Sequence, residues 1–215
     1  MAHIIAVLNS KGGTGKTTLT TNLAGCLHRR GHRVLIVDSD PQGSALDWME
    51  VRPEGIDLPD VVAMDRPVLH KNLPGVSKPY DFVLVDGAAK LEEMTTSAVK
   101  AADFVLIPVQ HSGLDMRALD ALTDAIHTRR ELTEGKPGAA FVISRQSQGT
   151  RLAHSVDGAL DDFGLPVLKA RTTQRVAYQE AGTLGVTVFE LESRDKAVLE
   201  IEAITNELLE RLNHG

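Results

Sequence analysis

Eight residues near the start of the chain, KGGTGKTT at positions 11–18, combine three glycines with two lysines and three threonines. They follow an apolar run at residues 4–8 and precede a stretch of helical periodicity, so they would join a strand to a helix. Backbone N–H groups from Gly12 to Thr18 could then surround a phosphate chain at the positive end of that helix. Lys16 would contact the β- and γ-phosphates, and the Thr17 hydroxyl would ligate Mg²⁺. The predicted cofactor-binding residues are Lys11, Gly12, Gly13, Thr14, Gly15, Lys16, Thr17 and Thr18.

Aspartates follow two further apolar runs. Asp38 and Asp40 come after residues 34–37, and Asp86 comes after residues 82–85. Because the carboxyl ends of parallel strands face one crevice, these carboxylates would lie beside the phosphate loop. Asp38 and Asp40 could instead only cap or turn the loop that contains Pro41.

A basic cluster lies in the second half of the chain, in KARTTQRVAYQE at residues 169–180. It contains Lys169, Arg171 and Arg175 and a single acidic residue, Glu180. Contact with nucleic-acid phosphates needs such clustering, although a solvated basic loop would have the same composition. The net charge is -6 and the pI is about 5.7, so contact with nucleic acid requires a local basic patch.

Short β-branched runs alternate with longer stretches of helical period, a pattern typical of a parallel sheet covered by helices on both faces. The expected strands are residues 4–8, 34–37, 61–64, 82–85, 104–107, 140–143 and, weakly, 167–168. The expected helices are residues 17–30, ended by Gly31, and residues 92–101, 116–130, 150–163 and 197–212. Residues 47–80 break the periodicity and allow only a short edge strand and one helix. We therefore expect the α/β class, with one doubly wound, mostly parallel sheet in a single domain, 1–215.

Composition limits the classes of protein to which the chain can belong. It is 42% hydrophobic and 24% charged, as a globular domain is. One cysteine, Cys26, and no charged-then-apolar N-terminal segment argue against secretion and against a thiolate-held metal cluster. No apolar run approaches the roughly 20 residues that cross a bilayer. A cytoplasmic protein without membrane contact is expected.

Ser10 stands where the strict phosphate-loop pattern has glycine, and Lys11 and Gly12 follow it. With this change the segment resembles the deviant Walker A motif, KGGxGKT, of the ParA/MinD family of P-loop ATPases. The resemblance implies that Lys11 is the signature lysine, which reaches across a dimer interface to phosphates bound by the other subunit. The alternative is that Lys11 is a solvated loop charge.

The resemblance covers nearly the whole chain. VLIVDSDPQGSALDW, from Val34, looks like the family's second strand and switch I segment. This implies that Asp40 orients or activates the attacking water and that Asp38 lies near the metal. FVLVDGAA resembles a Walker B strand, so Asp86 would hold Mg²⁺ through water. No proline follows Asp86, as in the small plasmid-partition (ParF-like) subgroup. The implied catalytic residues are Lys11, Lys16 and Asp40, and the implied metal residues are Thr17, Asp38 and Asp86.

The resemblance also implies contacts outside the phosphate loop. Residues 169–180 look like the stretch of ParA-type proteins whose arginines bind DNA without sequence preference. The implied DNA contacts are Lys169, Arg171 and Arg175. The segment after residues 140–143 lies where the family contacts adenine, which makes Ser144 or Arg145 a candidate base contact.

A partition ATPase is therefore the leading hypothesis. The resemblance implies ATP and Mg²⁺ as cofactors, an ATP-bound homodimer, and binding to nonspecific double-stranded DNA on the nucleoid. Hydrolysis would be slow and stimulated by a centromere-binding adaptor of ParB or ParG type, and would segregate plasmid or chromosomal DNA.

Three alternatives use the same core. Close relatives position protein cargo, such as carboxysomes or chemoreceptor clusters, through a cargo adaptor, and this alternative remains open. A MinD-like membrane cycle would need a basic C-terminal amphipathic helix, yet residues 198–215 are rich in glutamate. The apolar side chains there, Ile201, Ile204, Leu208 and Leu212, are expected to pack on the sheet. A reductase resembling the nitrogenase iron protein would need cluster-ligating cysteines, and Cys26 is alone.

Overall fold

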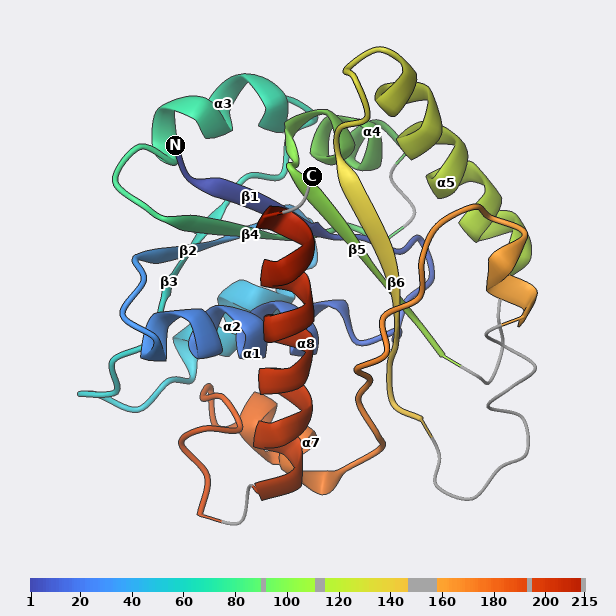
Figure 1. The fold of residues 1–215 in the computed structure, drawn as a ribbon. Helices are drawn as coiled ribbons and strands as arrows, with labels where there is room; N and C mark the ends of the chain where they lie inside the picture. Colours follow the sequence, from blue (N-terminus) through green and yellow to red (C-terminus); the bar gives the residue numbers. More distant parts are fainter. Residues whose placement is uncertain (90–91, 111–114, 147–157, 193–194, 214–215) are drawn as a thin grey trace.

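The computed structural model describes residues 1–89, 92–110, 115–146, 158–192 and 195–213. Within these residues the centre of the molecule is a six-stranded parallel sheet with the order β3-β2-β4-β1-β5-β6 (Figure 1). The strands are β1 His3–Val7, β2 Val34–Asp38, β3 Asp60–Ala63, β4 Phe82–Asp86, β5 Phe104–Val109 and β6 Gly138–Ile143. Because β1 lies between β4 and β5, the loop that follows it emerges at the middle of the sheet's carboxyl edge.

Burial explains why these runs form strands. Every residue of β2, β4 and β5 is buried, and His3 is the one exposed residue of β1. Continuous apolar runs of this kind belong to strands that are covered on both faces. The six longer strands expected from the sequence are confirmed. Of the weak seventh, Val167 forms an isolated parallel bridge to Phe141 and not a strand of its own.

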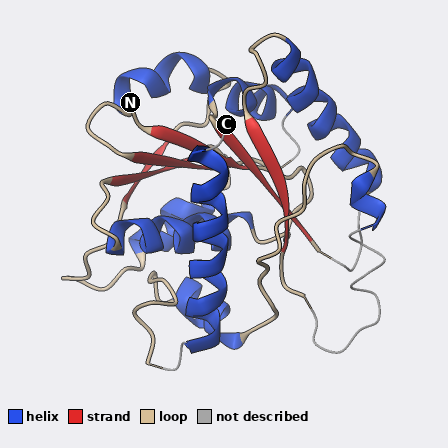
Figure 2. Ribbon diagram, viewed as in Figure 1, coloured by secondary structure: helices blue, strands red, loops and turns tan. Residues whose placement is uncertain are grey.

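Helices cover both faces of the sheet, as Figure 2 shows. On one face pack α1 Lys16–Arg29, α2 Ser44–Glu50, α7 Val176–Thr183 and α8 Asp195–Asn213. On the other face pack α3 Leu69–Val76, α4 Glu92–Ala101 and α5 Met116–Glu131. The α/β class and the doubly wound parallel sheet are confirmed.

Several boundaries differ from the sequence expectation. Gly31 follows the C-cap of α1 with a φ of 87°, in the left-handed region that glycine tolerates, so the first helix ends where expected. The helix expected at 150–163 is seen only at residues 158–161, and positions 147–157 lie outside the described residues. In residues 47–80, β3 and α3 are the expected edge strand and helix, but the end of α2 also lies in this range, so the expectation of a single helix there was wrong. In contrast, α2 and α7 are short helices that the periodicity did not indicate.

Among the residues that the structure describes, none of the helices combines the length and the apolar character that a membrane crossing requires.

Candidate nucleotide-binding site

The loop between β1 and α1 is shaped by glycine. Gly13 and Gly15 have φ angles of 76° and 91°, a region that side chains rarely adopt. A Cβ at Gly15 would also lie 2.9 Å from the Ser144 hydroxyl oxygen. Asn9 holds the start of the loop, because its Oδ1 accepts a hydrogen bond from Lys11 N–H at 2.9 Å and its Nδ2 donates to the carbonyl of Pro108 at 2.8 Å.

The N-terminus of α1 is open to an anion. Its N-cap is Gly15, and no side chain in the described part of the chain caps it. Most helices satisfy these N–H groups with a serine, threonine or aspartate side chain. A first turn capped by glycine instead directs its N–H groups and the positive end of the helix dipole toward a bound phosphate. The residues at 12–18 therefore fit the phosphate chain that the sequence predicts.

Two lysines meet at this loop. Lys16 is 8% exposed, and its Nζ lies 3.4 Å from the carbonyl oxygen of Lys11, to which it donates. Burial lowers the pKa of Lys16, while Asp86 and Asp40 act in the opposite direction. Lys11 is half-buried, and its carbonyl also accepts a hydrogen bond from the Thr14 hydroxyl at 3.3 Å. The backbone of Lys11 thus organises the loop, whatever its side chain does.

Asp86 ends β4 directly beneath the loop and is 1% exposed. Its Oδ2 accepts a hydrogen bond from the Thr17 hydroxyl at 2.6 Å, and its Oδ1 accepts one from Thr20 at 3.3 Å. Burial, helped by the neighbouring Asp38, raises the pKa of Asp86 to about 7 against the opposing threonine hydrogen bonds and Lys16. A hydroxyl and a carboxylate at this spacing supply the oxygen ligands that Mg²⁺ prefers.

Asp38 has a structural role that the sequence left open. It is 1% exposed, and its Oδ2 accepts hydrogen bonds from Ala45 N–H at 2.8 Å and Leu46 N–H at 3.1 Å. Its Oδ1 accepts one from Asp40 N–H at 3.1 Å. The carboxylate therefore satisfies the first N–H groups of α2, although burial raises its pKa. Capping is the contact seen, and the metal role of Asp38 stays a prediction.

Asp40 links two loops at the carboxyl edge of the sheet. Its Oδ1 accepts a hydrogen bond from Gln42 N–H at 3.0 Å, and its Oδ2 accepts one from Ala89 N–H at 3.2 Å. The residue is half-buried and acts electrostatically on Lys16. It therefore lies on the phosphate side of the sheet, and its role toward water stays a prediction.

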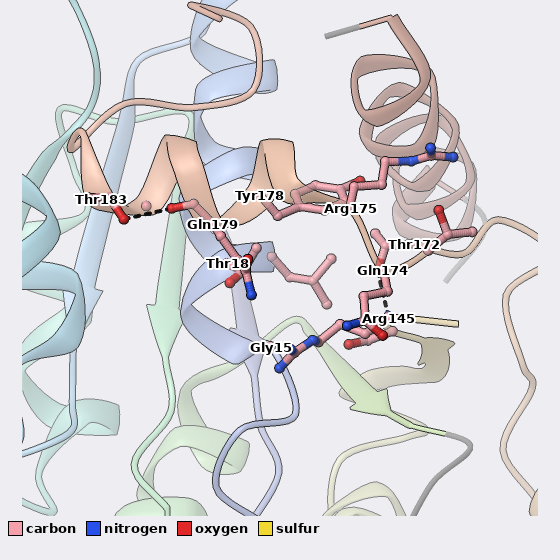
Figure 3. Close-up of a pocket in the computed structure, with 13 residues that line it drawn as sticks. Gly15, Thr18, Arg145, Thr172, Gln174, Arg175, Tyr178, Gln179 and Thr183 are labelled. Atoms are coloured by element: carbon pink, nitrogen blue, oxygen red, sulfur yellow. Dashed lines mark hydrogen bonds between the residues drawn. The ribbon is translucent and has the colours of Figure 1, made fainter. Parts of the chain in front are cut away.

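A pocket of about 450 Å³ opens beside the loop, within the range of ligand pockets. Figure 3 shows its lining, which includes Gly15, Thr18, Arg145, Thr172, Gln174, Arg175, Tyr178, Gln179 and Thr183. The Ser144 hydroxyl donates to the carbonyl of Thr14 at 2.6 Å, and Arg145 Nη1 donates to that of Gly13 at 3.4 Å. The two residues suggested as base contacts thus lie where the pocket meets the phosphate loop. The contribution of α7 to this wall had no signal in the sequence spacing.

The three cations of the basic segment at residues 169–180 lie in different environments in the structure. Lys169 is exposed and Arg171 is half-buried. The Arg175 side chain is 20% exposed, lines the pocket and pairs with Glu200 of α8, with Nη2 and Oε1 2.6 Å apart. Its guanidinium is directed to a carboxylate of its own chain, so Arg175 is a weaker candidate for a DNA contact than the exposed Lys169.

Asp86 makes the metal-free protein sensitive to pH. The folded state keeps the Asp86 proton up to about pH 7, whereas the unfolded chain releases it near 3.8. The contribution of this proton to the free energy of unfolding is at its full value below about pH 4, and it is lost as the pH rises from there through about 7. Asp86→Asn removes this dependence, so with EDTA at pH 8 it is expected to raise the free energy of unfolding by about 2–4 kcal/mol over wild type.

Urea unfolding between pH 5 and 8.5 measures this difference. Asp120→Asn, at an exposed position of α5, is the control and should follow the wild-type pH profile. Identical pH profiles for Asp86→Asn and wild type would show that Asp86 does not hold the proton.

A doubly wound sheet with a glycine-rich loop after its central strand, a buried carboxylate below that loop and a pocket beside it defines a P-loop nucleotide-binding protein. Residues 5–208 match the family described as the CobQ/CobB/MinD/ParA nucleotide binding domain. The chain belongs to this family, and the ParA/MinD resemblance of its sequence is confirmed.

Two relatives extend over most of the chain. It is 34% identical to "Maintenance of carboxysome distribution protein A" of Halothiobacillus neapolitanus, over 97% of both chains. It is 32% identical to the chromosome-partitioning ATPase Soj of Thermus thermophilus, over 86% of each. The solved structure of the septum site-determining protein MinD from Pyrococcus horikoshii, complexed with Mg-ADP, has a TM-score of 0.72 and 20% identity. It covers 97% of this chain and 96% of its own, and it shows that the fold is shared.

Proposed function

We propose that the protein is a single-domain ParA-type ATPase in which ATP and Mg²⁺ drive formation of a homodimer that binds DNA without sequence preference. The observation that carries this proposal is the phosphate loop with two lysines, Lys11 and Lys16, above the hydrogen bond between Thr17 and the buried Asp86. The curated relatives and the Mg-ADP complex of MinD support the same cofactors.

Each residue of the loop has a distinct part in this proposal. The N–H groups of residues 12–18 bind the phosphate oxygens, and Lys16 contributes a buried charge to the β- and γ-phosphates. Thr17 and Asp86 hold Mg²⁺, which neutralises phosphate charge when bound. Asp40 orients the attacking water, and Lys11 reaches the phosphates of the other subunit.

The pocket beside Gly15 and Thr18 would receive the base and ribose, because it adjoins the loop that binds the phosphates. Ser144 and Arg145 join this pocket to the loop through their hydrogen bonds to Thr14 and Gly13. These contacts make the pocket and the loop one continuous site for a nucleotide.

Lys169 and Arg171 would contact DNA phosphates, and a dimer would double the number of these cations. ATP would favour the DNA-bound dimer and ADP its release. The hydrolysis that converts one state into the other would be slow and stimulated by an adaptor protein.

Segregation of plasmid or chromosomal DNA is the cargo role that we propose, through a centromere-binding adaptor of ParB or ParG type. Protein cargo is the second candidate, because the relative from Halothiobacillus neapolitanus, 34% identical over nearly the full length, maintains carboxysome distribution. Both roles place the protein on the nucleoid in the cytoplasm, and the identity of the adaptor distinguishes them.

A membrane cycle of the MinD kind is disfavoured by α8. Ile201, Ile204 and Leu208 are completely buried in the core on this face of the sheet, and Leu212, the fourth apolar residue expected to pack there, is partly buried against the same core. The same helix carries the half-buried Glu202 and the exposed Glu210, which anionic lipid would repel.

Size-exclusion chromatography of the purified protein with ADP, with ATP, and with ATP and DNA tests the proposal. Monomer with ADP, dimer with ATP, and co-elution with DNA only in ATP are expected. A protein that stays monomeric and free of DNA in ATP would contradict the proposed dimerisation and DNA binding. Nucleotide binding is a separate claim and would be measured on its own.

Charge reversal at the basic segment separates DNA binding from dimerisation. Lys169→Glu combined with Arg171→Glu is expected to weaken DNA retention at least tenfold near 100 mM salt, because two phosphate contacts per subunit become repulsive. The ATP-dependent dimer should persist, because neither side chain belongs to the phosphate loop. Retention equal to wild type would exclude these two residues as DNA contacts.

A further inference from the structure

Glu200, on α8, lies behind the wall of the pocket that adjoins the phosphate loop. Its side chain is 13% exposed, and it accepts five hydrogen bonds from the described residues. Oε1 accepts from the Thr173 hydroxyl at 2.8 Å and from Arg175 Nε and Nη2 at 2.9 and 2.6 Å. Oε2 accepts from Thr173 N–H at 3.2 Å and from the Tyr178 hydroxyl at 2.8 Å.

All three donor residues line that pocket. Figure 3 labels two of them, Arg175 and Tyr178, on the same side of the pocket and opposite Gly15. The wall therefore consists of a loop residue, a cation and an aromatic ring that share one carboxylate. Since each donor depends on the same acceptor, the positions of the three side chains are coupled.

The charge of Glu200 is matched by Arg175. The hydrogen bond from Arg175 to Glu200 raises the pKa of the guanidinium, and burial followed by the nearby Glu200 charge raises the pKa of Tyr178. Removing one member of a largely buried ion pair leaves the other uncompensated, so Arg175 would turn from the wall toward the pocket or solvent.

We propose that Glu200 is a positioning residue for the base pocket, and that through Thr173, Arg175 and Tyr178 it sets the affinity for the nucleoside part of the ligand. This inference rests on the proposed nucleotide-binding function. It assigns Arg175 to the pocket wall. It also makes α8 part of the nucleotide site, although one layer of side chains separates this helix from the pocket.

A second glutamate on α8 gives a matched control. Glu207 lies seven residues further along the helix, and its Oε1 and Oε2 accept hydrogen bonds from the N–H groups of Lys169 and Ala170 at 3.2 and 3.1 Å. It holds the same segment to the same helix, but neither Lys169 nor Ala170 lines the pocket. A purely structural role for Glu200 would make the two substitutions equivalent.

The test compares Glu200→Gln with Glu207→Gln by calorimetry, using ADP and inorganic tripolyphosphate, each with Mg²⁺. ADP is chosen because it avoids the dimerisation expected with ATP. Glutamine keeps the size of the side chain but removes the negative charge that balances Arg175, and its amide nitrogen cannot accept the hydrogen bonds that Thr173 N–H and the Tyr178 hydroxyl donate to Oε2. We expect the ADP affinity of Glu200→Gln to fall about tenfold, with tripolyphosphate binding changed less than twofold, and both affinities of Glu207→Gln to stay within twofold of wild type.

Two results would overturn the inference. Either an unchanged ADP affinity in Glu200→Gln, or equal losses for ADP and tripolyphosphate, would remove Glu200 from the base pocket. Failure of the wild type to bind ADP would instead refute the underlying nucleotide proposal. If Glu200→Gln does not fold, Tyr178→Phe replaces it as the test variant, because it removes one of the five hydrogen bonds and keeps the ring. Its ADP affinity is expected to fall threefold or more, while its affinity for tripolyphosphate stays unchanged.

Discussion

Lys11→Ala is expected to bind ATP as a monomer, and to lose ATP-dependent dimerisation together with at least 100-fold of the hydrolysis rate. The substitution keeps the backbone contacts of Lys11 that organise the loop. Its N–H donates to Asn9, and its carbonyl accepts from Lys16 and Thr14. The lost side chain would remove the cation that each subunit supplies to its partner's phosphates, and removal of one such preorganised group typically costs ~10²–10³ in rate.

Light scattering with ATP and a phosphate-release assay measure the two effects, and calorimetry with ADP measures binding. Lys16→Ala is the matched control, because it truncates the lysine at the other end of the loop and should weaken nucleotide binding itself. The two variants would then fail at different steps. A Lys11→Ala protein that forms the ATP dimer and hydrolyses at the wild-type rate would reduce Lys11 to a solvated loop charge.

Most of the fold could be predicted because the signals are local. The runs in β2, β4 and β5 are apolar throughout, and a strand buried on both faces needs no alternation to be recognised. The phosphate loop was equally accessible, because its glycines and its position between a strand and a helix agree with one another. These elements place Thr17 beside Asp86, 69 residues apart in the chain.

The two missed helices, α2 and α7, are only seven and eight residues long. The helix α2 begins with N–H groups bound to Asp38, which lies six residues before its first residue, Ser44, across a loop. The helix α7 exposes Val176 while it buries Tyr178 and Ala181, so its apolar pattern is too short to stand out. Neither helix could be recognised from periodicity alone.

Arg175 illustrates the same limit for function. Clustering with Lys169 and Arg171 made it a candidate DNA contact, but the partner of a cation cannot be read from the cluster. That partner, Glu200, comes 25 residues later, on a helix that was expected from its sequence only to pack on the sheet. Charge composition located the basic segment but did not indicate that Arg175 pairs with Glu200 within the chain.

Asp40→Ala is expected to differ from Lys11→Ala in the dimer: the ATP-bound dimer persists, while hydrolysis again falls at least 100-fold, so the protein stays on DNA. The substitution removes the hydrogen bonds to Gln42 and Ala89, about 1 kcal/mol each, and leaves the phosphate loop intact. It also removes the proposed carboxylate for the attacking water, whose loss affects the chemical step and not the binding of ATP.

Retention of the variant on immobilised DNA after ATP is withdrawn measures this trapped state, and phosphate release measures the rate. Asp47→Ala is the control, because it truncates a nearby exposed aspartate on α2 and should release from DNA as the wild type does. Hydrolysis by Asp40→Ala within threefold of wild type would leave Asp40 with the loop-bridging role alone. Because one proposed switch connects both residues, an ATP dimer that fails to form without Lys11 and fails to dissociate without Asp40 would establish that dimer formation precedes hydrolysis.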